Sequence, residues 1–278
     1  MAEIAGVLMM SHVPAIGGAI AKGVQQEPYW KPFFDGFPPV RDWLAQAKPD
    51  VAVMVYNDHG LNFFLDKMPT FALGVAPQYQ NADEGWGIPV VPPFEGDEDL
   101  SWHLLESLVD AEFDPVSCQE MAVDHAFTLP LQLCWPDMKW PVRTVPVVVN
   151  TVQYPMPSAA RCAKLGRTIG DAIRAWDSDA RVVVFGTGGL SHQLEGERAG
   201  FINKPFDEKF MASMVDDPEW ATQFSIHDII EKTGTQGLEL LNWLAARNTV
   251  PGTMRTVHSN YHIPISNTAS ALMALEPA

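Results

Sequence analysis

The sequence of 278 residues has few cysteines and few basic residues, and it contains no long hydrophobic run. Its cysteines, Cys118, Cys134 and Cys162, lie far apart without a Cys-x-x-Cys pair, so neither a disulfide framework nor a thiolate zinc site is indicated. Only 18 Lys and Arg stand against 34 Asp and Glu, and the resulting charge of −16 argues against nucleic acids and anionic membranes as partners. The apolar segment near the N-terminus is too short for a signal peptide or a membrane span, so we expect a cytoplasmic protein.

The overall composition is that of an ordinary globular protein. Hydrophobic residues make up 47% and charged residues 19%, and the length suffices for one large α/β domain or two small ones. The sequence shows no internal repeat, no low-complexity segment and no linker. We therefore expect one domain over residues 1–278.

Three apolar segments are each predicted to be a strand buried on both faces of a sheet: residues 4–10, 51–56 and 181–185. A histidine follows each segment closely: His12, His59 and His192. In an open parallel sheet, ligands bind outside the carboxyl ends of the strands. Histidine is the commonest metal ligand and the usual acid or base near neutral pH, so chemistry is expected at this edge of the sheet.

The rest of the chain alternates between further predicted elements. Helices are predicted at residues 38–47, 99–110, 158–176, 206–215, 235–247 and 267–275, and strands at residues 69–75, 116–118, 142–149 and 256–265. Ser158 has the residue type and position of an N-cap for the clearest of these helices. The elements predict an α/β fold with a central, mostly parallel mixed sheet flanked by helices and an active site at the C-terminal strand ends.

Three features allow more than one interpretation. Asp124 beside His125 either caps the following helix or belongs to a site. Glu239 adjoins the apolar side of a predicted helix, where an acid either reaches solvent or ligates a metal. The glycine-rich segment 186–189 suggests a phosphate loop, but the Gly-Lys-Ser/Thr of a P-loop is absent and Ser191 replaces the third glycine of the dinucleotide fingerprint, which disfavours nucleotide binding.

The remaining candidates for metal ligands are nitrogen and oxygen donors. Two histidines and one carboxylate on one face of a metal leave positions open for substrate and dioxygen, as in non-haem Fe(II) oxygenases. A zinc hydrolase would use the same kinds of ligand. The spacing of the residues does not by itself choose the three ligands.

Six motifs follow one another along the chain: S-H-V-P at 11–14, Y-N-D-H at 56–59, A-D-E-G-W-G at 82–87, V-D-H at 123–125, G-T-G-G-L-S-H-Q-L at 186–194 and H-I-P-I-S-N-T-A at 262–269. In this combination and order, the chain resembles the LigB-type (class III) extradiol ring-cleaving dioxygenases over nearly its whole length. The resemblance is closest to the catalytic β subunits that cleave protocatechuate. It implies Fe(II) held by His12, His59 and Glu239, with His192 as the acid/base and His125 as a second active-site histidine.

The resemblance also implies a reaction and a partner. Asn57, Ser266 and Asn267 fall in segments that line the substrate pocket in this family. The implied enzyme cleaves protocatechuate (3,4-dihydroxybenzoate) with O2 at the 4,5 bond to give 4-carboxy-2-hydroxymuconate semialdehyde. Gallate or another catecholic acid as substrate, and a catalytically silent binding protein on the same fold, remain alternatives. Because the chain stops at Ala278 without an α-like region, a separate small α subunit in an α2β2 heterotetramer is expected.

Overall fold

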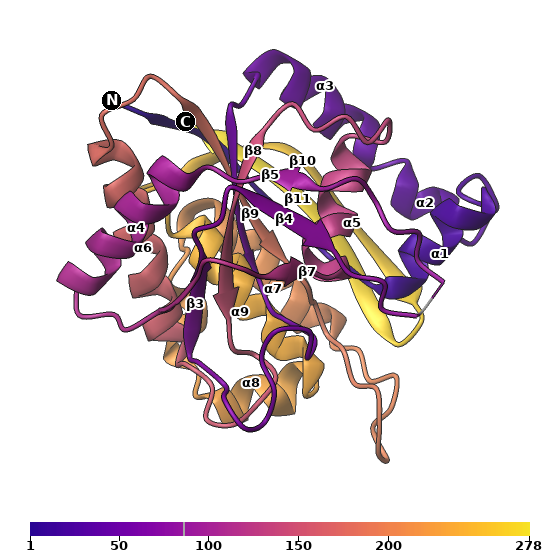
Figure 1. Ribbon diagram of the computed structural model, residues 1–278. Coiled ribbons are helices and arrows are strands. Elements are labelled where there is room, and N and C mark those ends of the chain that lie inside the picture. The colour runs from indigo at the N-terminus through magenta and orange to yellow at the C-terminus, as the bar shows by residue number, and fades with distance from the viewer. Residues whose placement is uncertain (86) are drawn as a thin grey trace.

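A central sheet of eight strands organises the part of the chain that the structure describes (Figure 1). The computed structural model describes residues 1–85 and 87–278, so Trp86 of the 82–87 motif lies outside the described residues. Across the sheet the strands follow the order β10 (Met254–Ile265), β11 (Thr268–Pro277), β1 (Glu3–Met10), β9 (Arg181–Thr187), β2 (Val51–Tyr56), β8 (Arg143–Val149), β3 (Phe71–Gly74) and β6 (Val116–Cys118).

The sheet is mixed, with a parallel centre. The strands β1, β9, β2 and β8 pair in parallel, whereas β11 pairs antiparallel with β1, and β3 pairs antiparallel with β8. Every residue of β2 is buried, as expected for a central strand that is covered on both faces. A small second sheet contains β5 (Phe94–Glu95), β4 (Gln78–Asn81) and β7 (Ala122–Val123). The predicted α/β fold with a mostly parallel mixed sheet is confirmed.

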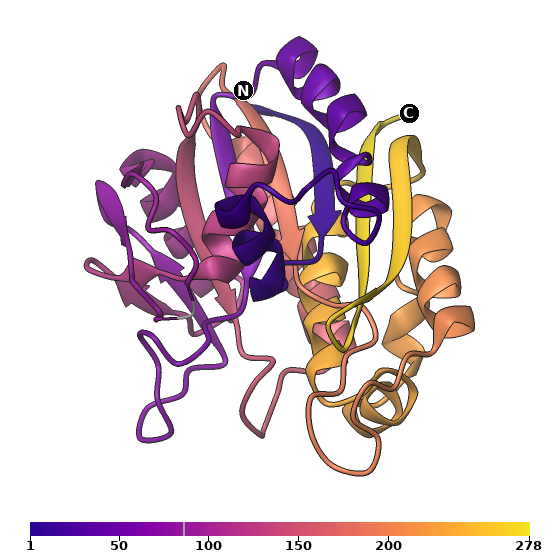
Figure 2. The same ribbon diagram turned by 90° about the vertical axis from the view of Figure 1, so that its right-hand side faces the viewer.

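Helices cover both faces of the large sheet (Figures 1 and 2). One face carries α4 (Glu98–Asp110), α6 (Ala159–Ala175), α7 (Lys204–Asp216) and α9 (Leu240–Arg247), with α8 (Ile226–Thr233) nearby. The other face carries α1 (Pro14–Lys22), α2 (Lys31–Phe34), α3 (Phe37–Ala47) and α5 (His125–Cys134). Alternate residues of β2 divide between the two cores, since Val53 and Val55 pack with the first group while Met54 and Tyr56 pack with the second.

The order of the central strands brings three segments of the chain together. Because β1, β9 and β2 are parallel neighbours, their carboxyl ends meet at one edge of the sheet. The histidines that follow these strands are therefore neighbours in space although they are far apart in sequence. In both views this edge faces the lower end of the molecule, and the N-terminus and C-terminus lie at the upper end (Figures 1 and 2).

The predicted helix at residues 267–275 is wrong, because this segment is strand β11. Its alanines, leucines and methionine favour a helix locally. Pairing with β1 on one side and with β10 on the other overrides that preference, and Leu272 lies opposite Met10 in the register. Ser158 caps α6 as predicted, since its side chain accepts a hydrogen bond from the backbone N–H of Arg161. No helix in residues 1–85 and 87–278 is long and apolar enough to cross a membrane.

Candidate active site

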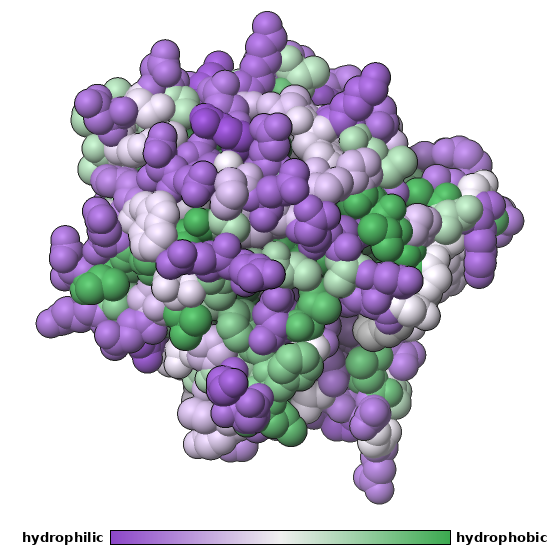
Figure 3. Space-filling view, viewed as in Figure 1, coloured by the Kyte–Doolittle hydropathy of each residue, from purple (hydrophilic) through white to green (hydrophobic). Residues whose placement is uncertain are grey.

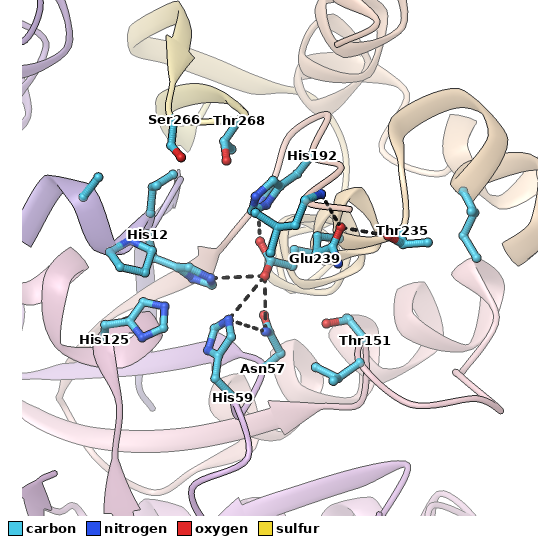
Figure 4. Close-up of a pocket in the computed structure, with 18 of the residues that line it drawn as sticks. His12, Asn57, His59, His125, Thr151, His192, Thr235, Glu239, Ser266 and Thr268 are labelled. Atoms are coloured by element: carbon cyan, nitrogen blue, oxygen red, sulfur yellow. Dashed lines mark hydrogen bonds and ion pairs between the residues drawn. The ribbon is translucent and has the colours of Figure 1, made fainter. Parts of the chain in front are cut away.

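The carboxyl ends of β1, β9 and β2 open into a cavity of about 610 Å³ (Figure 4). The structure brings seven of the predicted site residues together in its wall: His12, Asn57, His59, His125, His192, Glu239 and Ser266. Asn267 is not among the described residues that line the cavity. Its side chain faces Gly200 instead, where an added Cβ would lie 3.5 Å from the Asn267 Oδ1 atom.

Two imidazoles face the carboxylate of Glu239. Its Oε1 atom lies 3.3 Å from Nε2 of His12 and 3.6 Å from Nε2 of His59. The Nδ2 group of Asn57 also donates to this Oε1 atom, at 3.3 Å. The acid therefore turns toward the histidines and is only 7% exposed, which decides between the two interpretations left open by the sequence.

The hydrogen bond at the far side of His12 determines which nitrogen faces the cavity. The Nδ1 atom of His12 lies 3.1 Å from the hydroxyl of Thr187, and that hydroxyl donates its own proton to the carbonyl of Ala126 at 2.9 Å. The Thr187 oxygen must then accept from His12, so Nδ1 carries the hydrogen. Nε2 is then the nitrogen that faces Glu239, and it would give its lone pair to a metal ion bound there.

His59 is held in the same way by Asp124. The Oδ2 atom of Asp124 accepts from both Nδ1 and the backbone N–H of His59, at 3.0 and 2.8 Å. Burial lowers the pKa of His59, but the carboxylates of Asp124 and Glu239 outweigh it and raise the pKa to about 10. Burial raises the pKa of Asp124, but the charge and hydrogen bonds of His59 outweigh burial and lower the pKa to about 2. Asp124 is therefore ionised near neutral pH and can only accept hydrogen bonds.

Asp124 has a second role at the start of α5. Its Oδ1 atom accepts from the backbone N–H of Ala126 at 2.9 Å, which is an N-cap. The helix-cap and site interpretations of the Asp124–His125 pair therefore both hold for the same carboxylate. The cap also fixes His125, which is the first residue of the helix.

A third carboxylate orients His125. Oε1 of Glu84 lies 2.8 Å from Nδ1 of His125, and Oε2 of Glu84 accepts from the backbone N–H of His125 at 2.7 Å. The ring centroid of His125 lies 4.3 Å from that of His59 and 5.4 Å from that of His12. Burial lowers the pKa of His125, with Glu84 opposing it, so the imidazole is the favoured form near neutral pH.

The glycine-rich segment after β9 contacts Glu239 rather than a phosphate. The backbone N–H of Gly189 donates to Oε2 of Glu239 at 2.7 Å. Gly188 has a φ of 115°, and an added Cβ there would lie 2.5 Å from Cβ of Glu239, so only glycine fits beside the acid. Burial raises the pKa of Glu239, but His12 and His59 outweigh it and hold the pKa well below its usual range.

The donors at this point fit a divalent metal ion. A metal with bonds of about 2.1 Å requires its neighbouring ligand atoms to be about 3.0–3.4 Å apart. The separations of 3.3 and 3.6 Å around Glu239 are close to that range. One nitrogen each of His12, His59 and His125 also lies within 4.8 Å of the others. Outer hydrogen bonds that fix the tautomer of each imidazole are typical of metal-binding histidines.

His192 lies on the opposite wall of the cavity from His125 (Figure 4). Burial lowers the pKa of His192, with the negative charge of Glu239 opposing that effect. A neutral imidazole near pH 7 can accept a proton from a bound molecule and return it later.

The remaining wall comes mostly from residues that the sequence did not single out. Apolar side chains are contributed by Val13, Pro14, Ala15, Val152, Met156, Leu194 and Ile230, and polar ones by Thr151, Thr235, Gln236 and Thr268. No lysine or arginine is among the described lining residues. Most of these residues lie in loops or near element ends, where periodicity gives no signal.

Comparisons with known proteins agree with this geometry. The profile of the family described as "Catalytic LigB subunit of aromatic ring-opening dioxygenase" matches residues 6–271. The chain therefore belongs to the LigB family, a class of ring-opening dioxygenase subunits. It is 37% identical to a gallate dioxygenase of Pseudomonas putida over 196 residues, which is 70% of this chain and 57% of that protein.

Two further similarities extend this result. The chain is 30% identical over 207 residues to a 2,3-dihydroxyphenylpropionate/2,3-dihydroxicinnamic acid 1,2-dioxygenase of Photorhabdus laumondii, covering 74% of this chain and 62% of that protein. A solved structure of an uncharacterized protein from Escherichia coli K12 has the same fold, with a TM-score of 0.54, 14% identity and coverage of 98% and 99% of the two chains. The alignments thus span about three fifths of these two curated relatives.

Proposed function

We propose that residues 1–278 form one catalytic domain of a non-haem Fe(II) extradiol dioxygenase. The observation that carries this proposal is the convergence of His12 Nε2, His59 Nε2 and Glu239 Oε1, with Nδ1 of each imidazole held by an outer oxygen so that Nε2 is the atom left for a metal. These three side chains would hold the ion on one face, as in the two-histidine, one-carboxylate arrangement.

The side chains of the pocket supply the remaining chemistry. Bound Fe(II) would favour the anion of a catechol hydroxyl and bring dioxygen into reaction with the ring. His192, neutral near pH 7, accepts the hydroxyl proton and later returns a proton to an oxygen atom of the reacting O2 as the ring opens. His125, held by Glu84, presents its Nε2 side to the same space. The apolar wall limits the access of water to the reacting ring.

We infer that the substrate is a catecholic acid, with protocatechuate favoured and gallate as the main alternative. Cleavage of protocatechuate at the 4,5 bond, with both atoms of O2 incorporated, gives 4-carboxy-2-hydroxymuconate semialdehyde. Because the described lining residues include no cationic Lys or Arg, neutral donors such as Ser266 and Thr268 would bind the carboxylate. The names of the relatives describe dioxygenases of other aromatic acids, which supports the substrate class and leaves the individual acid as a proposal.

We also propose a small α subunit as the partner that covers the mouth of the pocket in an α2β2 heterotetramer. Large apolar side chains are exposed on the loops that follow β2, β8 and β9: Phe64 (57%), Leu65 (80%), Val152 (54%), Tyr154 (77%) and Leu194 (48%). Val152 and Leu194 line the pocket itself. Hydrophobic residues are also visible among hydrophilic ones at the lower end of the molecule (Figure 3). Such a patch beside a pocket is typical of an interaction surface.

The test of the activity is an anaerobic reconstitution. The purified chain receives Fe(II) and protocatechuate, then air is admitted while oxygen uptake and the visible spectrum are recorded. One O2 consumed per yellow semialdehyde formed supports the proposal. Parallel reactions with gallate and with 2,3-dihydroxyphenylpropionate rank the substrates by kcat/KM.

Failure of this reaction would separate the alternatives. If iron binds and no product forms with any of the three acids, the experiment is repeated with a co-expressed α subunit. Continued inactivity would contradict the dioxygenase proposal and favour a silent binding protein. If the chain binds no iron, the proposed ligand set is wrong.

A further inference from the structure

His192 differs from the other three imidazoles of the pocket in the way it is held. His12, His59 and His125 each have Nδ1 within hydrogen-bond distance of a side-chain oxygen. The Nδ1 atom of His192 is buried without a hydrogen-bond partner among the described residues. The direction of its ring must therefore come from the backbone on either side of it and from packing.

On one side, the backbone of His192 is fixed to the last residue of α8 and to the segment that follows it. Its N–H donates to the carbonyl of Thr233 at 2.7 Å, and its carbonyl accepts from the N–H groups of Gln236 and Gly237, both at 3.2 Å. The two segments approach so closely that a Cβ added to Gly234 would lie 2.2 Å from the His192 oxygen. This contact fixes the peptide of His192. The carbonyl of its preceding neighbour, Ser191, accepts from the N–H of Ala269 at 2.9 Å, which leaves the N–H and hydroxyl of Ser191 to be held by another group.

That neighbour is held by a buried acid, Asp207, in the first turn of α7. Oδ1 of Asp207 accepts from the hydroxyl and the backbone N–H of Ser191, at 2.8 and 3.2 Å. Oδ2 accepts from the hydroxyl of Tyr261 at 2.8 Å, and the Ser191 hydroxyl accepts from the N–H of Asn203 at 3.1 Å. Asp207 is 1% exposed, and neither it nor Ser191 is among the described residues that line the pocket.

We propose that Asp207 is a positioning residue that acts on His192 through Ser191. A rotation of the backbone that turned the imidazole away from the pocket would break two hydrogen bonds to a buried carboxylate. Both carboxylate oxygens are acceptors only, so they match the three donors of Ser191 and Tyr261 without a competing donor. The expected effect of Asp207 on turnover rests on the proposed function. Its expected effect on the orientation of the His192 ring does not, because that effect depends only on contacts within the chain.

The test compares two pairs of variants. Ser191→Ala removes the hydroxyl bond to Asp207, and Ser213→Ala is the matched control, because Ser213 is buried on the same helix and donates only to the Phe210 carbonyl at 2.7 Å among its described contacts. Asp207→Ala removes the acceptor, and Asp207→Asn returns an acceptor for Ser191 together with an amide that can donate to the Tyr261 oxygen.

Two measurements are made on the full chain. With Fe(II) and a catecholic acid, we expect Ser191→Ala and Asp207→Ala to lower kcat by about tenfold or more and to leave KM within about twofold of wild type. A tenfold loss is part of the full contribution of an acid/base group. Asp207→Asn should restore at least about half of the wild-type kcat, since it restores the acceptor. Without metal, the ¹H–¹³C signals of the eight histidine rings are recorded, and the His192 signal is assigned with His192→Gln.

The ring signal separates this proposal from the proposed function. We expect the His192 signal to shift or broaden in Ser191→Ala and Asp207→Ala, and to stay in place in Ser213→Ala and Asp207→Asn. An unchanged His192 signal in Ser191→Ala overturns the positioning role, whatever happens to kcat, and Ser191→Ala remains informative if Asp207→Ala fails to fold. A shifted signal with unchanged kcat would uphold the positioning role and contradict the assignment of His192 as the acid/base.

Discussion

Replacing Asp124 by asparagine tests how strongly the outer hydrogen bonds support the metal site. Asp124 accepts three hydrogen bonds, two from His59 to Oδ2 and one from Ala126 to Oδ1. Asparagine has the same shape and is an equally good N-cap, so its oxygen can keep the bond to Ala126 and the start of α5. Its NH2 group then faces the Nδ1 and backbone N–H groups of His59. Both groups donate to Asp124 in the wild type, so at least one of these two buried hydrogen bonds is lost.

The size of the effect follows from these contacts. Asp124 is 1% exposed, so water does not replace the lost partner. To avoid a clash with the new NH2 group, Nδ1 of His59 must give up its hydrogen, so that any hydrogen left on the imidazole lies on Nε2, the nitrogen that faces Glu239. A metal would have to reverse that change, and loss of such an outer partner typically lowers metal affinity by about 10–100-fold.

The assay is a competition titration of the metal-free chain with Fe(II) and a chromophoric chelator under anaerobic conditions. The matched control is Asp97→Asn, because Asp97 is also 1% exposed and caps a helix, through the N–H of Leu100 at 2.9 Å. Asp97 lies beside Thr144 at the opposite end of β8, away from the pocket. We expect reduced metal affinity in Asp124→Asn alone. A well-folded Asp124→Asn chain that binds Fe(II) within about twofold of the wild-type affinity would refute the reasoning.

Three further predictions follow from the same structure. His12→Ala, His59→Ala and Glu239→Gln should each lose bound iron and turnover together, as measured by metal analysis and oxygen uptake, and full iron content in any one of them would exclude that ligand. His192→Phe should keep its iron and lower kcat by about 10²-fold or more, and a near-wild-type rate would contradict its acid/base role. Asp207→Asn should become more stable relative to wild type as the pH rises. Burial raises the pKa of Asp207 from 3.8 to about 6, so ionisation of this carboxyl destabilises the folded wild type. The destabilisation is absent below about pH 4 and complete above about pH 6. Each pKa unit corresponds to about 1.4 kcal/mol, so the gain in the free energy of unfolding approaches about 3 kcal/mol. Urea unfolding of both proteins at pH 4 and pH 7.5 measures it, and the same difference between variant and wild type at the two pH values would contradict the reasoning.

The sequence by itself determined the central strands and the edge at which chemistry is found. The apolar runs that become β1, β2 and β9 are recognisable because strands buried on both faces have a local signature. The polar residues after them mark the carboxyl ends, and the six motifs indicate the family. Ser158 and Asp124 were recognisable as caps because capping depends on a few neighbouring residues.

Only the tertiary structure decided which distant groups meet. Glu239 is 227 residues from His12 in sequence, and nothing in its local pattern distinguishes an acid that reaches solvent from one that turns to a metal. The segment that becomes β11 has helical composition, and only its pairing with β1 and β10 makes it a strand. The glycines after β9 leave space for Glu239, and Asp207 reaches Ser191 in the loop after β9 from helix α7. Local propensity is a weak preference that long-range packing overrides, so these contacts become visible only in the folded chain.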